Sequence, residues 1–141
     1  MIQVTAIPTE HVIEIWPRVR EFITDVCAHT HGRYEPEDVL DELCAGVSHL
    51  WVAFEDKNIL GAVVTNIMNY PRKRVLNCPF VTGDDFKSWK DPMLALLRRF
   101  AADHGCACLE STARLGWARV FKDDGYEALW QTFELPLGEE K

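Results

Sequence analysis

Residues 81–105, VTGDDFKSWKDPMLALLRRFAADHG, have the pattern of a strand end, a loop, a helix and a stop. The pair Asp91-Pro92 is a favourable helix start, with Asp91 as the N-cap and Pro92 in the first turn. We therefore expect a helix from about Pro92 to His104, which Gly105 ends.

The rest of the chain alternates strand and helix patterns on both sides of this segment. Apolar residues predict strands over Ile2–Ile7, His49–Phe54, Ile59–Met68, Val75–Val81, Cys106–Ser111 and Tyr126–Leu135. Helical spacing and helix-ending glycines predict helices over 12–27, 36–46 and 115–123. Pro17 lies inside the first helix and must kink or split it. The order β-α-α-β-β-β-α-β-α-β predicts an α/β domain with a mixed central sheet and helices on both faces.

Length and composition limit the possible classes of protein. The 141 residues suit one domain over 1–141, and 48% hydrophobic with 26% charged residues is typical of a soluble protein. The net charge of −7 argues against a general nucleic-acid binder. No run of eighteen apolar residues predicts a membrane span, and MIQVTAIPTEHV lacks the features of a signal peptide. We therefore expect a cytoplasmic protein with no nucleic-acid or membrane partner.

The five cysteines are scattered and form no CxxC pair. In a cytoplasmic chain they are expected to be small buried hydrophobes rather than disulfide partners. Cys106 and Cys108 would share one face of a strand, and Cys27 lies close to His29 and His31. Neither group has enough further ligands at a suitable spacing, so no metal site is predicted.

Several segments together resemble the GCN5-related N-acetyltransferase (GNAT) family over the whole chain. ILGAVVTNI resembles its central strand, AADHG followed by CACLES resembles its cofactor helix and fifth strand, and WARVFKDDGYEAL resembles its closing helix and sixth strand. IWPRV, GRYEPEDV, YPRKRV, GDDFKSW and LGWARVFKDDGY are similar to short GNAT-like proteins of tailed bacteriophages and prophages. The resemblance supports the fold more strongly than the chemistry.

The resemblance implies acetyl-CoA as cofactor, held through its pyrophosphate by a loop of the pattern Q/R-x-x-G-x-G/A. The matching stretch here, GDDFKSWKDPM, has Gly83 and no later glycine. An Asp91 cap would occupy the amide donors that a phosphate needs, and Pro92 has no N–H. We therefore predict a degenerate loop, closed by its own cap and with Phe86 and Trp89 packed on the domain. Any remaining cofactor contacts are expected from Val81, Thr82, Gly83, Lys87 and Lys90.

Few residues are available for catalysis in the way that the resemblance implies. Acetyltransferases of this fold often use a tyrosine of the last helix as general acid, and that position falls on Phe121. Glu110 is the one acidic residue well inside the predicted sheet. It would be a general base if it faces the cleft, and the alternative is a solvated carboxylate at a strand end.

Other residues are candidates for contacts with an acceptor or a protein partner. Arg33 and Tyr34 precede the second helix, in the region that frames the acceptor site in GNAT folds. A basic hairpin tip and the start of the last helix supply the rest: Tyr70, Arg72, Lys73, Arg74, Arg114, Trp117 and Arg119. The alternatives are a surface-loop role for Arg33 and Tyr34, a solvated turn for the hairpin tip, and core packing for Trp117.

Two functions remain open from the sequence. The first is an acetyl-CoA-dependent N-acetyltransferase that acts on an amine of a small molecule or protein. The second is a catalytically silent GNAT-like phage protein that binds a protein partner or belongs to the virion. Separated strands with free amides beside residues 82–90 would favour the enzyme, and a cleft filled by Phe86 or Trp89 would favour the binding protein.

Overall fold

Five strands form one sheet in the order β1-β2-β3-β4-β5 in the computed structural model, which describes residues 1–113 and 117–138. Their bounds are β1 Gln3–Ile7, β2 His49–Glu55, β3 Asn58–Tyr70, β4 Lys73–Gly83 and β5 Cys108–Glu110. The pairs from β1 to β4 are antiparallel, whereas β4 and β5 are parallel. The predicted α/β class with a mixed sheet is confirmed.

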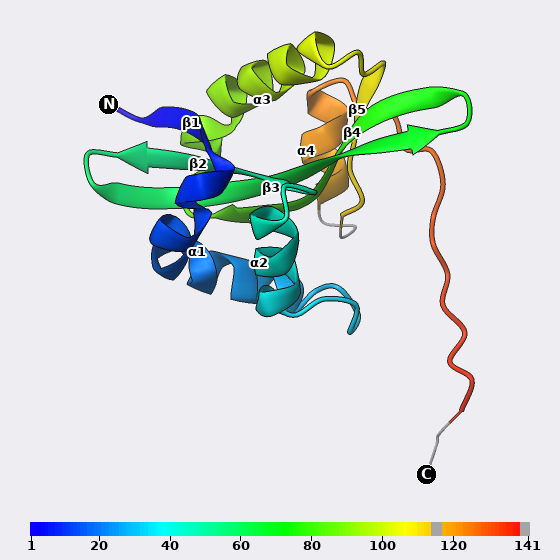
Figure 1. The fold of residues 1–141 in the computed structure, drawn as a ribbon. Coiled ribbons are helices and arrows are strands. Elements are labelled where there is room, and N and C mark those ends of the chain that lie inside the picture. The colour runs from blue at the N-terminus through cyan, green and yellow to red at the C-terminus, as the bar shows by residue number, and fades with distance from the viewer. Residues whose placement is uncertain (114–116, 139–141) are drawn as a thin grey trace.

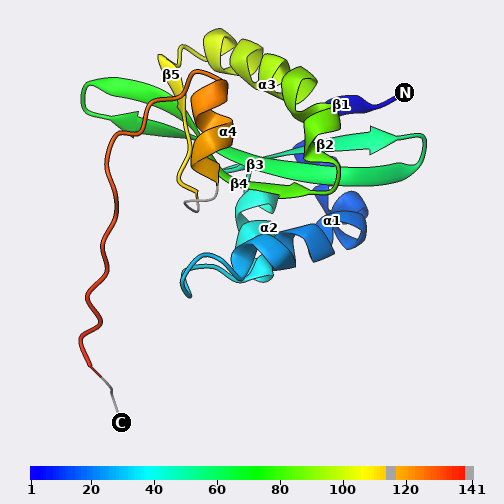
Figure 2. The same cartoon turned by 180° about the vertical axis from the view of Figure 1, so that it is seen from behind.

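Helices cover both faces of this sheet. A short 3-10 turn, Thr9–His11, leads into α1 (Val12–Cys27), and α2 is Pro36–Cys44. These two helices lie on one face, while α3 (Phe86–Asp103) and α4 (Ala118–Asp123) lie on the other (Figures 1 and 2). Each face has its own apolar cluster, because β2, β3 and β4 contribute buried side chains to both.

Both helices of the first layer begin and continue much as expected. α1 is a single helix with Pro17 inside it, so the proline does not split it. Pro17 has no N–H for the carbonyl of Ile13, which leaves one hydrogen bond of the helix unmade. α2 begins at Pro36, where the missing N–H costs nothing because the first turn has no partner for it.

The predicted start of α3 at Pro92 is wrong. The helix begins at Phe86 after Asp85, which has a left-handed backbone (φ 55°), and Asp91 and Pro92 lie inside it. The cause is the burial of Trp89, whose side chain is 0% exposed and whose Nε1–H donates to the Asp84 carbonyl over 2.8 Å. Figure 2 shows that α3 changes direction along its length, as an internal proline requires.

Two glycines allow Trp89 to reach its position. Gly61 of β3 faces Gly83 of β4 in the sheet register, and the Trp89 indole lies against Gly61. A Cβ on Gly61 would be 2.4 Å from Cζ2 of Trp89, and one on Gly83 would be 2.3 Å from Cα of Gly61. The Asp84 N–H also donates to the Leu60 carbonyl over 2.7 Å, which fixes the chain between β4 and α3.

The C-terminal part differs most from the expectation. No strand forms over the predicted range Tyr126–Leu135 among the described residues, and this segment runs away from the sheet (Figure 1). Its alternating apolar pattern suits a strand, but no neighbouring strand supplies the hydrogen bonds. β5 is also shorter than predicted, and α4 is described only from Ala118.

The cysteines are free, and the expectation that all five are buried is correct for only two of them. Cys27 and Cys78 are buried, whereas Cys44 and Cys108 are exposed and Cys106 lies between these classes. Burial raises the pKa of the Cys78 thiol to about 12, so it stays protonated. Cys106 lies outside β5, so it does not share a strand face with Cys108.

A polar chain crosses the apolar cluster between the sheet and α3. The Trp51 Nε1–H donates to Oγ1 of Thr65 over 2.9 Å, and Oγ1 lies 3.4 Å from Nδ1 of His49. The His49 ring packs edge-on against Phe100, on which His104 also stacks. Burial, and next the charge of His104, lower the pKa of His49. The folded chain therefore favours neutral His49.

Substitution of Gly61 by alanine should destabilise the fold. The new methyl group must displace both the Trp89 ring and the backbone at Thr82, and overpacking of this kind costs about 1–3 kcal/mol. Gly46→Ala is the control, because its Cβ would meet nothing and only its φ of 76° opposes the change. Urea unfolding measures both. An equal or smaller loss for Gly61→Ala would contradict the packing.

Protonation of His49 should make the fold less stable in acid. Because its pKa is lowered in the folded chain, this contribution to stability is present above the unfolded value of about 6.5 and is lost as the pH falls below it. His49→Gln should therefore flatten the decline in unfolding free energy as the pH falls below about 6.5. Identical pH profiles for native chain and His49→Gln would refute this role.

Candidate active site

The candidate site starts where β4 and β5 separate. The two strands pair at Val75–Cys108, Leu76–Leu109 and Asn77–Glu110, and β4 then continues to Gly83 without β5 beside it. The Ser111 hydroxyl donates to the Cys78 carbonyl over 2.8 Å at the point of separation. Residues 78–83 of β4 thus border an opening in the sheet, which we call the β4–β5 opening.

A small cavity lies beside this opening, between α3 and α4. Its volume is about 50 Å³, and its lining includes Phe86, Trp89, Trp117, Phe121 and Tyr126. Ligand sites usually enclose about 300–1,000 Å³, so this α3–α4 cavity is too small for a cofactor as it stands. Aromatic contacts fill the space, with Phe86 ring centroids 5.0 Å from Trp89 and 5.1 Å from Trp117. The predicted packing of Phe86 and Trp89 on the domain is confirmed.

An ion pair joins the two helices at this cavity. Nζ of Lys90 lies 2.6 Å from Oδ1 of Asp124 and 3.2 Å from Oδ1 of Asp91. The hydrogen bond to Asp124 is the largest cause that raises the pKa of Lys90. The side chains of Lys90 and Asp124 are only 22% and 14% exposed, so this pair is partly shielded from solvent. Lys90, expected near the cofactor phosphates, is therefore engaged with α4.

The first turn of α3 lacks the side-chain cap that the sequence predicts. No side chain forms a hydrogen bond that caps this helix, so the prediction that Asp91 occupies its amide donors is wrong. The Asp84 N–H is engaged by Leu60, and Ser88 N–H by the Asp85 carbonyl. Lys87 is exposed in the same turn. An uncapped helix start with an adjacent cation is a suitable place for a phosphate.

The remaining expected cofactor residues border the opening in different ways. Val81 is partly buried and lines the α3–α4 cavity. The Thr82 hydroxyl donates to the Phe22 carbonyl of α1 over 3.0 Å, so its side chain is tied to the other layer. Gly83 is exposed, with a φ of 138° that favours glycine.

Tyr126 is a site residue that the sequence reasoning missed. After the turn at Gly125 its ring returns against Phe121, with centroids 4.7 Å apart, and it lines the α3–α4 cavity. Burial is the largest cause that raises the pKa of Tyr126 to about 12. The cavity thus contains a phenol from a residue beyond the helix, whereas position 121 is a phenylalanine. The feature of the sequence that could have indicated this is a tyrosine directly after Gly125, the glycine that ends α4.

Glu110 lies beside Tyr70 rather than in the α3–α4 cavity. The Tyr70 hydroxyl donates to Oε2 of Glu110 over 2.7 Å, and this hydrogen bond is the largest cause that raises the pKa of Tyr70. Two candidates from distant segments are thus brought together at the end of the β3–β4 hairpin. Arg72 and Arg74 are exposed on the same hairpin.

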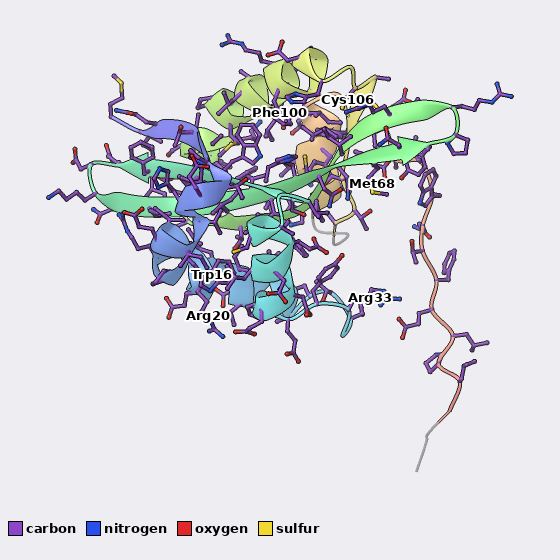
Figure 3. The ribbon with its side chains drawn as sticks, viewed as in Figure 1. Trp16, Arg20, Arg33, Met68, Phe100 and Cys106 are labelled. Atoms are coloured by element: carbon purple, nitrogen blue, oxygen red, sulfur yellow. The ribbon has the colours of Figure 1, made fainter. Side chains whose placement is uncertain are left out.

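The other candidates are distributed over separate parts of the surface. Arg33 points outward from the α1–α2 layer and forms an ion pair with Glu134 over 2.9 Å (Figure 3). The Tyr34 ring packs edge-on against Phe80 of β4, 5.3 Å between centroids. Trp117 fills the α3–α4 cavity, and Arg114 lies outside the described residues.

Two kinds of feature are absent from the described residues, a metal site and a membrane-spanning helix. No three histidine, cysteine, aspartate or glutamate side chains in 1–113 and 117–138 gather closely enough to hold a metal ion. No helix in the same ranges is long and apolar enough to span a membrane.

Comparison with known proteins supports the fold. No protein-family model matches the chain, and neither does any curated protein. Among solved structures, a ribosomal-protein-alanine N-acetyltransferase from Brucella melitensis biovar Abortus 2308 matches with a TM-score of 0.71 and 14% identity, covering 98% of this chain and 100% of that one.

Two further solved structures show the same likeness. A predicted acetyltransferase with acetyl-CoA from Clostridium acetobutylicum has a TM-score of 0.71 and 13% identity, over 97% of both chains. An aminoglycoside acetyltransferase from an uncultured soil metagenomic sample, in complex with sisomicin, has a TM-score of 0.68 and 11% identity, over 99% of this chain and 97% of that one. The chain has the GNAT fold.

Loss of the Lys90–Asp124 ion pair should loosen α4. Lys90→Gln leaves the partly buried Asp124 carboxylate without its main cation, so amide hydrogen exchange should rise in residues 118–125. Lys87→Gln is the matched control, since it removes an exposed cation from the same helix. Unchanged exchange in α4 of Lys90→Gln would mean that the aromatic contacts alone hold it.

Proposed function

We propose that the chain is an acetyl-CoA-dependent N-acetyltransferase with a degenerate pyrophosphate loop, whose α3–α4 cavity opens to admit the cofactor. The observation that carries the proposal is the uncapped first turn of α3 beside the β4–β5 opening. Backbone donors, a helix dipole and Lys87 there favour an anion with several oxygens. The acetyltransferase structures with the same fold support the same class of reaction.

The residues present suit the pyrophosphate of the cofactor better than the arm that carries its acetyl group. The pyrophosphate would be held by the first turn of α3, with Lys87 as the cation and Gly83 allowing close approach. The arm that carries the acetyl group would pass between the strands at residues 78–83, alongside Val81. This route requires Phe86 and Trp117 to separate, because they now occupy the α3–α4 cavity.

Acetyl-CoA supplies an activated acetyl group as a thioester when it is bound. Tyr126 is the chain's proton donor in the proposal, because its high pKa keeps the phenol protonated beside the opening. Glu110 would accept a proton from the acceptor amine, directly or through the Tyr70 hydroxyl that it already binds. Positioning of the amine against the thioester supplies the remaining rate enhancement.

The acceptor in this proposal is a primary amine of a small molecule or a protein. Both kinds occur in the names of the solved structures, one being a ribosomal-protein-alanine N-acetyltransferase and the other an aminoglycoside acetyltransferase. Arg33, Tyr34, Tyr70, Arg72 and Arg74 are the proposed residues for acceptor or partner contacts. Their charges favour an acceptor that also carries an acidic group.

The filled cavity favours a second candidate, a catalytically silent GNAT-fold protein that binds another protein. In that case Phe86, Trp89 and Trp117 form permanent packing, and the Lys90–Asp124 pair locks it. The similarity to short phage proteins would then point to a binding or virion-associated role. This location, like a cytoplasmic one, remains a prediction from the sequence.

Calorimetric titration with acetyl-CoA distinguishes the two candidates. The enzyme should bind in the micromolar range, about −8 kcal/mol, and Lys87→Gln should weaken binding by about fivefold to tenfold. Lys122→Gln, on α4, is the control and should bind as the native chain does. No heat and no thermal stabilisation at millimolar acetyl-CoA would favour the silent protein.

Tyr126→Phe tests the proposed proton donor once an acceptor amine is found. Loss of the hydroxyl should lower kcat by about a hundredfold while the acetyl-CoA dissociation constant stays within about twofold, because the ring packing is kept. An unchanged kcat would exclude Tyr126 from the reaction.

A further inference from the structure

A second cavity lies on the face of the sheet opposite to the α3–α4 cavity, and we call it the α1 cavity. Its volume is about 560 Å³, within the range of about 300–1,000 Å³ that small-molecule sites usually enclose. It is formed by α1, the first three strands and the turn between β2 and β3. The proposed acetyltransferase reaction uses none of its residues, so the inference below does not depend on that activity.

The floor of the α1 cavity is apolar. Alternate residues of a strand point to the same face of a sheet, so Val52 and Phe54 of β2 both face the helix α1. Ile59 lies opposite Phe54 on β3, while Ile7 of β1 and Ile15 of α1 complete the floor. Val52 is buried and the other four side chains are only partly buried. The floor therefore belongs to the core and still offers apolar surface to a ligand.

The packing of α1 explains why this part of the sheet is left open. The buried stripe of α1 runs from Val12 to Cys27 at a spacing of three or four residues, and it covers the middle of the sheet. Ile15 and Arg18 lie beside that stripe, three residues apart, and both line the cavity. The β2–β3 hairpin extends past the layer of α1 and α2 (Figures 1 and 2). The helices thus leave the end of the hairpin uncovered.

The side chain of Arg18 connects α1 to the β2–β3 turn at the mouth of the α1 cavity. Its Nη2–H donates to the Lys57 carbonyl, and Arg18 and Lys57 are both exposed. A guanidinium has five N–H donors in a planar fork, so this one hydrogen bond leaves others for a ligand. The turn also places Asp56 at the mouth, with a left-handed backbone (φ 55°).

The charges at the mouth select the chemical class of the ligand. Arg18 and Lys57 carry positive charge and Asp56 carries negative charge, so the mouth has one excess cation. Within 1–113 and 117–138 neither cation forms an ion pair, although the chain has 22 acidic residues. An arginine without an acidic partner beside an apolar floor suits a carboxylate that is attached to an apolar body.

We propose that the α1 cavity binds a small monocarboxylic acid with an apolar body. The carboxylate lies on Arg18 and Lys57, and the hydrocarbon lies on the floor between β2 and α1. A single negative charge is neutralised by the one excess cation, whereas a second carboxylate would meet Asp56. A medium-chain fatty acid has this chemistry.

Titration of the ¹⁵N-labelled chain with octanoate tests the proposal. Octanoate should bind with a Kd on the order of 0.1 mM, and octan-1-ol should bind about tenfold more weakly because it lacks the charge. The backbone amide resonances of residues 54–59 and 15–18 should shift, and those of residues 78–90 should not. Shifts in residues 78–90 alone would place the acid in the α3–α4 cavity. That result, or no saturation at about 10 mM octanoate, would overturn the proposal.

Variants at the mouth separate recognition of the carboxylate from support of the hairpin. Arg18→Gln should weaken octanoate binding by about tenfold and leave octan-1-ol binding unchanged, whereas Arg18→Lys should keep most of the affinity. Asp56→Asn should tighten octanoate binding by about twofold, since it removes the negative charge at the mouth. Arg20→Gln is the control, because it removes an exposed cation of α1 that pairs with Glu37 and does not line the cavity. An equal loss of both ligands in Arg18→Gln would show that the arginine only holds the hairpin, against the proposed contact.

A filled cavity gives an independent check. Thr5 of β1 is exposed at the rim, and a tryptophan there is compatible with an edge strand and would occupy the cavity. Thr5→Trp should abolish binding of octanoate and of octan-1-ol together. The cavity would instead be an interface between copies if the resonances of residues 54–59 shifted with protein concentration in the absence of octanoate, and this outcome would also refute the proposal.

Discussion

The contact of Trp89 with Gly61 controls the geometry of the whole α3 side of the molecule. The indole occupies the space that any side chain at Gly61 would fill, and Gly83 approaches Gly61 from the neighbouring strand. Its N–H donates to the Asp84 carbonyl, so one side chain fixes the strand end, the loop and the first turn of α3 together. Three segments of the chain therefore depend on the absence of two Cβ atoms.

The contact of Trp89 with Gly61 favours the phosphate end of the proposed cofactor and opposes entry of the rest of it. By starting the helix at Phe86, it leaves the first turn of α3 without a side-chain cap and close to Lys87. By placing Trp89 and Phe86 beneath Trp117, it also fills the space between α3 and α4. The same packing thus leaves the uncapped helix start that we propose for the phosphates, and it closes the route that the rest of acetyl-CoA would need.

The sequence predicted the fold well where local patterns and packing agree. The first four strands, α1 and α2 follow from apolar periodicity, and the helix-starting Pro36 falls where expected. The start of α3 could not be predicted in this way, since Asp91-Pro92 is a good local start and only the burial of Trp89 outweighs it. Tyr126–Leu135 also has a good strand pattern, but a strand requires a partner edge that local sequence does not specify.

The site was less predictable, because its partners come from distant segments. The sequence predicts Lys90 as a cation near the loop, but its pairing with Asp124 depends on how α4 packs. The pairing of Tyr70 with Glu110 depends on the parallel register of β4 and β5. The apolar pattern predicts a strand at Tyr126, whereas the turn at Gly125 returns its ring to Phe121.

Nuclear magnetic resonance of the ¹⁵N-labelled chain with added acetyl-CoA tests the central claim most directly. We expect the resonances of the Phe86 and Lys87 backbone amides and of the Trp117 indole N–H to shift. The resonance of the Trp89 indole N–H should stay unchanged, because its hydrogen bond to Asp84 persists. A spectrum that does not change at millimolar acetyl-CoA, or one in which the Trp89 indole moves while the first turn of α3 does not, would contradict it.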